Sequence, residues 1–170
     1  RLEFFPGRHA WMPEPLAAEA VAWHEVQAMR RGLRPRDDSL LAALLAADGE
    51  QARALEAGGE PLAAMRRWQA AAATFDGLVA VDHARAEAIR LAALPAVTDA
   101  LAEYARWRAY EQGYLEAMRQ TLTTLAGGEP PPVPLLLREF RVPELERMAD
   151  RPGVEGATGN RLLESVWSQL

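Results

Sequence analysis

Residues 39–75 read SLLAALLAADGEQARALEAGGEPLAAMRRWQAAAATF, and this stretch decides the fold. Apolar residues recur at spacings of three and four before Gly58 and Gly59, and again after Pro61. Such spacing places them on one face of an α-helix; the double glycine ends a first helix and the proline opens a second. The stretch therefore predicts two helices joined as an antiparallel hairpin.

The same spacing continues through most of the chain and predicts further helices. Asp37 or Ser39 is placed to cap the helix that opens the quoted stretch. A short apolar run, Leu2–Phe5, predicts only a strand stub. The fold class is therefore all-α. The expected helices are residues 13–31, 39–58, 61–75, 82–93, 95–125, 135–149 with an interruption at Val142-Pro143, and 159–170.

Composition and charge exclude several classes of protein. Hydrophobic residues make up 49% of the 170 residues and the formal charge is −5, which suits packed helices and argues against a nucleic-acid surface. All basic residues are arginine, as in proteins of GC-rich bacteria. Without cysteine, disulfides and thiolate metal sites are excluded. No apolar run reaches the roughly 18 residues of a membrane span, so we expect a soluble protein of the cytoplasm or periplasm.

Glycine and proline clusters divide the chain, and GGEPPP at residues 127–132 is the strongest helix breaker. We predict that residues 1–33 form a strand, a histidine turn and a helix. Residues 34–126 form the helical-hairpin core, residues 127–132 a joint, and residues 133–170 a C-terminal helical pair. The chain begins without methionine and ends inside an apolar stripe, so we expect a piece of a longer protein.

The quoted stretch carries a pattern typical of one family of helical repeats. Small residues let two helices approach closely, and an aromatic residue fills the space between them. The positions are Ala52, Leu55, Gly59, Ala64, Trp68 and Ala71. They resemble one degenerate tetratricopeptide repeat, which implies tetratricopeptide-like antiparallel hairpins in an α-α superhelix or bundle. An aromatic residue expected early in the first helix is missing, and other alanine-rich hairpins fit the same loose pattern.

The segment Phe5–Pro13, FPGRHAWMP, contains a histidine after a glycine turn and is the part of the chain that most suggests catalytic chemistry. It resembles the C-terminal catalytic-histidine segment of bacterial α/β-hydrolases of the esterase and dienelactone hydrolase type, except that Met12 intervenes before the proline. The resemblance implies that His9 takes a proton from a serine nucleophile, which would lie upstream of Arg1. Alternatively, His9 is a polar residue beside a turn, since the chain contains no Gly-x-Ser-x-Gly elbow.

Neither a metal nor a cofactor is predicted. His9, His24 and His83 are far apart and none has a ligand partner at helical spacing. Two pairs of carboxylates have the spacing of solvated helix faces and lack the Glu-x-x-His motif of carboxylate-bridged bundles. These pairs are Glu19 with Glu25 and Glu111 with Glu116.

Aromatic residues in the helix predicted at 95–125 spread over more than one face, so at least one ring should be exposed or lie at a contact. Tryptophan, tyrosine and arginine are enriched at protein interfaces. The alternative is that these rings pack in the core. The candidate interaction surface comprises Tyr104, Trp107, Arg108, Tyr110 and Tyr114.

Together these features predict a helical protein–protein interaction or oligomerisation module, the C-terminal accessory region of a larger α/β-hydrolase that is not catalytic alone. Its partner would be a protein or peptide, its own upstream hydrolase domain, or a second copy in a homodimer. Two alternatives stay open. One is a fragment of a serine esterase or peptidase with His9 as the base of the triad, and the other is a structural helical bundle with no separable activity.

Overall fold

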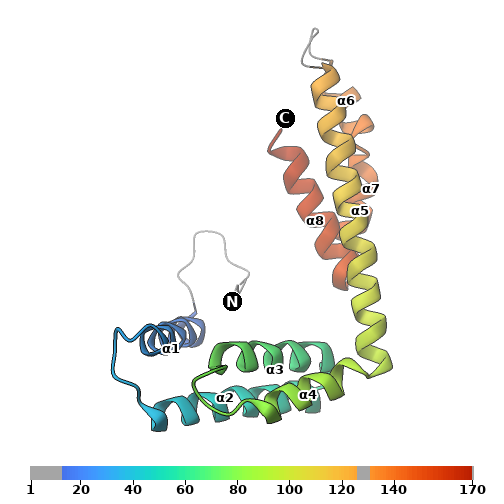
Figure 1. Ribbon diagram of the computed structural model, residues 1–170. Coiled ribbons are helices and arrows are strands. Elements are labelled where there is room, and N and C mark those ends of the chain that lie inside the picture. Colours follow the sequence, from blue (N-terminus) through green and yellow to red (C-terminus); the bar gives the residue numbers. More distant parts are fainter. Residues whose placement is uncertain (1–12, 126–130, 170) are drawn as a thin grey trace. The chain divides into compact units, whose positions relative to one another are not determined.

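The computed structural model describes residues 13–125 and 131–169, and every regular element in these residues is an α-helix (Figure 1). The predicted all-α fold class is confirmed. The predicted strand stub at residues 2–5 lies outside the described residues. In chain order the helices are α1 (Glu14–Arg30), α2 (Asp38–Ala57), α3 (Pro61–Phe75), α4 (Asp82–Ala92), α5 (Pro95–Leu125), α6 (Val133–Glu139), α7 (Val142–Ala149) and α8 (Gly153–Trp167).

The chain divides into two compact units, residues 1–98 and residues 99–170. The boundary falls inside α5 and precedes the predicted joint at residues 127–132. Each unit has its own cluster of buried hydrophobic side chains: Val97, near the start of α5, belongs to the first, and Met118, near its end, belongs to the second.

In unit 1, α2 and α3 form the helical hairpin that the sequence predicts, and α3 also packs against α4 (Figure 1). Leu41 and Ala52 of α2 and Ala64 of α3 are fully buried between the helices. The chain turns at Gly59, whose φ of +80° is a left-handed conformation that other residues rarely adopt. The short turn and the small residues bring the two helices together.

The closest approach in this hairpin is between Gly49 of α2 and Trp68 of α3. A Cβ atom at Gly49 would lie 2.7 Å from Cη2 of the indole, a distance at which one of the two must move. Trp68 is itself only 3% exposed and is surrounded by the core of the unit. Glycine is therefore required at this position by packing, although it lowers the intrinsic stability of the helix.

Arginine side chains hold α1 against the hairpin. The guanidinium of Arg30 donates to the carbonyl oxygens of Thr74 at 2.7 Å and Asp76 at 3.0 Å, at the C-terminal end of α3. Carbonyl groups at a helix end lack partners within the helix, so a cation placed there satisfies them. Arg67 of α3 forms an ion pair with Glu19 of α1, with an N···O distance of 3.0 Å. Polar contacts thus supplement the apolar contacts of α1.

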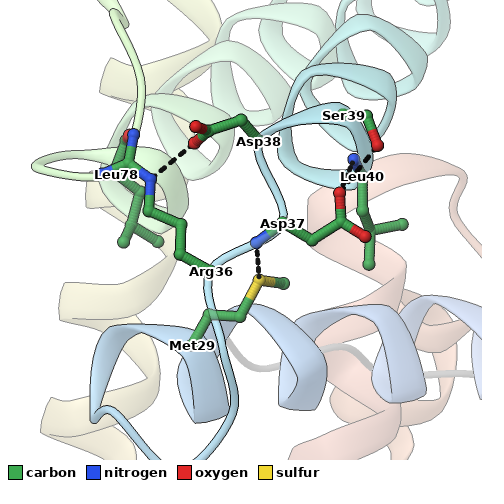
Figure 2. A network of polar contacts seen from close by, with 7 residues as sticks. All are labelled: Met29, Arg36, Asp37, Asp38, Ser39, Leu40 and Leu78. Carbon is green, nitrogen blue, oxygen red and sulfur yellow. Dashed lines mark hydrogen bonds and ion pairs between the residues drawn. The ribbon is translucent and has the colours of Figure 1, made fainter.

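The link between α1 and α2 is fixed by polar contacts around Asp37, shown in Figure 2. The Asp37 carboxylate accepts hydrogen bonds from the Leu40 N–H at 3.0 Å and from the Ser39 hydroxyl at 2.7 Å. The Asp37 N–H donates to the sulfur of Met29 at 3.3 Å. Of the two predicted candidates for the cap of α2, the structure therefore selects Asp37.

Arg36 ties the same link to the connection between α3 and α4. Its guanidinium donates to the carbonyl oxygen of Leu78 and to the Asp38 carboxylate, the latter at 2.5 Å (Figure 2). The path of the chain between α1 and α2 thus depends on residues that are distant in sequence.

In unit 2, α7 and α8 pack closely because α8 carries glycine at two contact positions. A Cβ atom at Gly156 would lie 1.8 Å from the carbonyl oxygen of Arg151, and one at Gly159 would lie 2.6 Å from the backbone nitrogen of Ala149. Neither position has room for a side chain. The buried side chains of the unit are Met118, Phe140, Val142, Leu145, Met148, Leu162 and Val166.

The structure corrects the prediction for this unit in two places. The interruption predicted at Val142-Pro143 falls one residue earlier, at Arg141, which has a left-handed φ of 52°, and it separates two helices, α6 and α7. The predicted start of the last helix at 159 is wrong: α8 begins at Gly153, after Pro152 as its N-cap. Gly156 and Gly159 both lie inside α8, where close contacts with the end of α7 and with the connection that follows it leave no room for a side chain.

We expect Asp37→Ala to lower the free energy of unfolding, and Asp37→Asn to retain most of it near neutral pH, because asparagine is an equally good cap. Hydrogen bonds from Leu40 and Ser39 hold the pKa of Asp37 below its usual value. The ionised Asp37 carboxylate therefore contributes to the free energy of unfolding at pH values above its usual pKa, and this contribution is lost as pH falls through the lowered pKa. Urea denaturation at about pH 7 and about pH 2 should show a smaller acid-induced loss for Asp37→Asn than for the native chain. Unchanged stability of Asp37→Ala would contradict the assigned cap.

We expect Gly49→Ala to lower the free energy of unfolding by about 1 to 3 kcal/mol, because overpacking against Trp68 outweighs the gain in helix propensity. Gly113→Ala in α5 is the matched control at a protein concentration where the chain is monomeric, since within one chain a Cβ atom there has no neighbour within 4 Å. It should stabilise the chain by about 0.5 to 1 kcal/mol. Urea denaturation followed by circular dichroism measures both, and stabilisation by both substitutions would refute the packing constraint.

Candidate functional site

The predicted interaction surface on α5 divides into a packed part and an exposed part. Trp107, Tyr110 and Tyr114 pack against the buried cluster of unit 2, with the rings of Trp107 and Tyr110 edge to face at 5.6 Å between centroids. Tyr104 is 41% exposed, and Arg108 is exposed as well. Core packing thus accounts for three of the predicted residues, while Tyr104 and Arg108 face solvent.

Tyr114 fixes the corner between α6 and α7. Its hydroxyl donates a hydrogen bond to the carbonyl oxygen of Phe140, the residue that ends α6. Burial, with a further contribution from Tyr110, raises the pKa of Tyr114 to about 12. Next to this bond, Arg141 holds its left-handed conformation and forms an ion pair with Glu144 at 2.5 Å. The corner is therefore positioned by α5.

Glu111 connects α5 with α8 within the same unit. Both of its oxygens accept hydrogen bonds from Arg161, at 2.8 and 2.7 Å, in a bidentate ion pair. The hydrogen bond and charge of Arg161 lower the pKa of Glu111 despite partial burial. Each of the other carboxylates considered in the sequence also has an arginine partner: Glu116 with Arg119, Glu19 with Arg67, and Glu25 with Arg34.

A groove runs along α5 beside α6 and α7, and we call it the α5 groove. It consists of two adjoining hollows of about 410 and 480 Å³ that share Ala117, Thr121 and Glu139 as lining residues. Cavities of this size are in the range that ligands occupy. The other lining residues are Ala109, Tyr110, Gly113, Tyr114, Met118, Phe140 and Arg141 in one hollow, and Gln120, Thr124, Leu125, Pro131, Leu135 and Leu136 in the other.

Small residues form much of the α5 side of the groove. Ala109, Gly113, Ala117 and Thr121 recur every four residues and therefore follow one side of the helix. The first three are exposed, and no atom lies within 4 Å of a Cβ built at Gly113. Sequence reasoning missed this set because it followed the large aromatic residues; the regular spacing of small residues was the available signal.

The described residues bring no serine hydroxyl to a histidine. His24 and His83 each pack edge to face on a tryptophan, with ring centroids 5.1 and 5.4 Å apart. The segment that resembles a hydrolase, with His9, lies outside the described residues. The serine hydroxyls that donate to other groups are those of Ser39, Ser165 and Ser168.

Within residues 13–125 and 131–169, no three histidine or carboxylate side chains are grouped to hold a metal ion. None of the described helices has both the length and the apolar character to cross a membrane.

Comparison of the chain with models of protein families, with curated proteins and with solved structures gives no match. The geometry of the α5 groove is therefore the basis for assigning a function.

We expect Tyr114→Phe to lower the free energy of unfolding by about 1 kcal/mol, because the Phe140 carbonyl loses its donor. Tyr110→Phe is the control, since in the described part of the chain its hydroxyl makes no hydrogen bond. The pKa of Tyr114 is raised to about 12. The contribution of the protonated hydroxyl to the free energy of unfolding is therefore complete below about pH 10 and is lost as pH rises from there through 12. Urea denaturation across this pH range should show that the free energy of unfolding falls more steeply with pH in the native chain than in Tyr114→Phe. An equal pH dependence in the two chains would rule out the assigned environment of Tyr114.

Proposed function

We propose that the chain is a helical protein–protein interaction module whose α5 groove receives the α5 helix of a second copy, so that two chains form a homodimer. One observation carries this proposal: two adjoining hollows of about 410 and 480 Å³ follow a side of α5 that presents small, exposed residues.

The shape and lining of the groove suit a helix better than a small ligand. The hollows follow one another along α5, and their lining is largely apolar, with Glu139 and Arg141 on the opposite side. Recognition of a helix in an apolar groove is a recurring mode of protein binding. Side chains of an approaching helix would fill the hollows and remove apolar surface from water.

A second copy of α5 fits because the line of small residues is symmetric about Gly113. In an antiparallel pair centred there, Ala109 of one copy faces Ala117 of the other, and Ala105 faces Thr121. A dimer with twofold symmetry uses the same patch on both chains, so this correspondence is the required one. Small residues opposite small residues let the two backbones approach closely.

The charges along α5 agree with this pairing. With Gly113 at the twofold axis, Arg106 faces Gln120, Glu116 faces Tyr110, and Arg119 faces Trp107. No charged residue of α5 meets one of the same sign, which would weaken association.

One sequence feature adds support to an interaction role. The resemblance of α2 and α3 to a tetratricopeptide repeat favours it, since arrays of such hairpins present binding surfaces. The link to an upstream α/β-hydrolase is a prediction that depends on residues 5–13. If that link holds, the dimer would bring two catalytic domains together.

Because the chain has no cysteine, a single introduced cysteine tests the dimer axis. We expect Gly113→Cys to form a disulfide-linked dimer under mild oxidation, since two Cα atoms at the axis would lie within the roughly 7 Å that a disulfide requires. Gln112→Cys is the control: it is equally exposed but points about 100° away around the helix. Non-reducing gel electrophoresis measures both, and equal cross-linking of the two variants would refute the axis.

Light scattering coupled to size-exclusion chromatography tests the assembly itself. We expect the native chain to be a dimer and Ala117→Glu to raise the dimer dissociation constant about tenfold or more, since it buries a charge in the groove. Ala42→Glu on the exposed face of α2 should leave the dimer intact. A native chain that stays monomeric at high concentration, with no cross-linking at Gly113→Cys, would exclude the homodimer.

A further inference from the structure

Glu139 is the charged residue of the α5 groove that has no partner in the described part of its own chain. It lines both hollows, together with Arg141 in one of them. Arg141 forms an ion pair with Glu144 at 2.5 Å, whereas Glu139 is exposed and makes no ion pair or hydrogen bond with residues 13–125 and 131–169. A helix that enters the groove removes water from this carboxylate, which then needs an opposite charge.

The position of Glu139 is also unfavourable for a carboxylate within the chain itself. Glu139 is the last residue of α6, and the carbonyl groups at the C-terminal end of a helix carry partial negative charge. A cation suits this position better than an anion. The local structure of α6 therefore gives no reason for a glutamate here, and a reason has to come from outside the chain.

Arg106 is the cation that α5 offers on the groove side. It precedes Gly113 by seven residues, which is about two helical turns, so the two lie on the same side of the helix. Arg108 points about 140° away from Gly113, and Arg119 has a carboxylate partner on its own helix. The Arg106 side chain is 70% exposed and approaches Glu103 only to 4.0 Å. Such an exposed pair contributes little to stability, so Arg106 can exchange it for another.

The register of the proposed dimer brings these two charges to the same hollow. With Gly113 at the twofold axis, Arg106 of the second copy faces Gln120, because each is seven residues from the axis. Gln120 and Glu139 line the same hollow of about 480 Å³. The guanidinium of the second copy therefore arrives beside the carboxylate. Twofold symmetry repeats this contact at the other end of the interface.

We propose that Arg106 of each chain forms an ion pair with Glu139 of the other, and that these two pairs fix the antiparallel register of the α5 helices. The inference rests on the proposed dimer and adds what selects its arrangement. In a parallel pair, by contrast, Arg106 would face its own copy, and like charges would oppose association. The groove thus recognises a second copy by charge as well as by the small size of its residues.

Exchange of the two charges tests the ion pair. Arg106→Glu and Glu139→Arg should each raise the dimer dissociation constant about tenfold or more, since each variant places like charges together at both ends of the interface. Mixed in equal amounts, the two variants should form a heterodimer, because both contacts then join a glutamate to an arginine. Light scattering measures the assembly of each variant, and native mass spectrometry identifies the heterodimer.

Arg108→Glu and Glu50→Arg are matched controls, since they make the same charge changes at exposed positions that line neither hollow. Each should form a homodimer like the native chain. If Gly113→Cys cross-links but Arg106→Glu and Glu139→Arg dimerise normally, or if these two variants do not associate on mixing, the ion pair is overturned and the dimer stands. A native chain that stays monomeric and does not cross-link overturns both.

Discussion

The contact between Trp68 and Gly49 sets the separation of α2 and α3, and the remainder of unit 1 is arranged around that pair. The indole lies so close to Gly49 that a single methyl group there would collide with it. Along the same interface, Ala52 and Ala64 are fully buried, so small side chains maintain the separation over the length of the hairpin. α4 packs against α3 as well, with His83 on the same indole. A protein interior of normal density leaves little freedom in such an arrangement.

The attachment of α1 follows a different principle. Arg30 of α1 reaches carbonyl oxygens at the end of α3, and Arg67 of α3 pairs with Glu19 of α1. Arg36, in the link after α1, reaches the carbonyl oxygen of Leu78. Long side chains hold two helices together without bringing their backbones close. Where alanines line the resulting space, a hollow remains. The hollow thus lies where arginine side chains, together with the buried Val26 and Met29, fasten α1 to the hairpin.

Unit 2 combines both principles in one helix. On one side of α5, Trp107, Tyr110 and Tyr114 pack on the core of the unit. On an adjacent side, alanine and glycine leave the α5 groove open next to α6 and α7. The hydrogen bond from Tyr114 to the Phe140 carbonyl connects the two sides, because it holds the corner that forms the far edge of the groove. The same helix therefore supports the fold and presents the proposed interaction surface.

The sequence alone determined the helical character of the chain and most helix limits. Caps, prolines and apolar spacing act within a few residues, and Pro61 at the start of α3 is one example. It misplaced the start of α8, since Gly156 and Gly159 are required by close contacts with the Arg151 backbone and with α7 that no local pattern reveals. Only the tertiary structure decided which rings of α5 are packed, that small residues border a groove, and that Arg67 meets two carboxylates from other helices. These outcomes depend on which distant segments lie side by side, and a side chain gains its partners only when the helices are assembled.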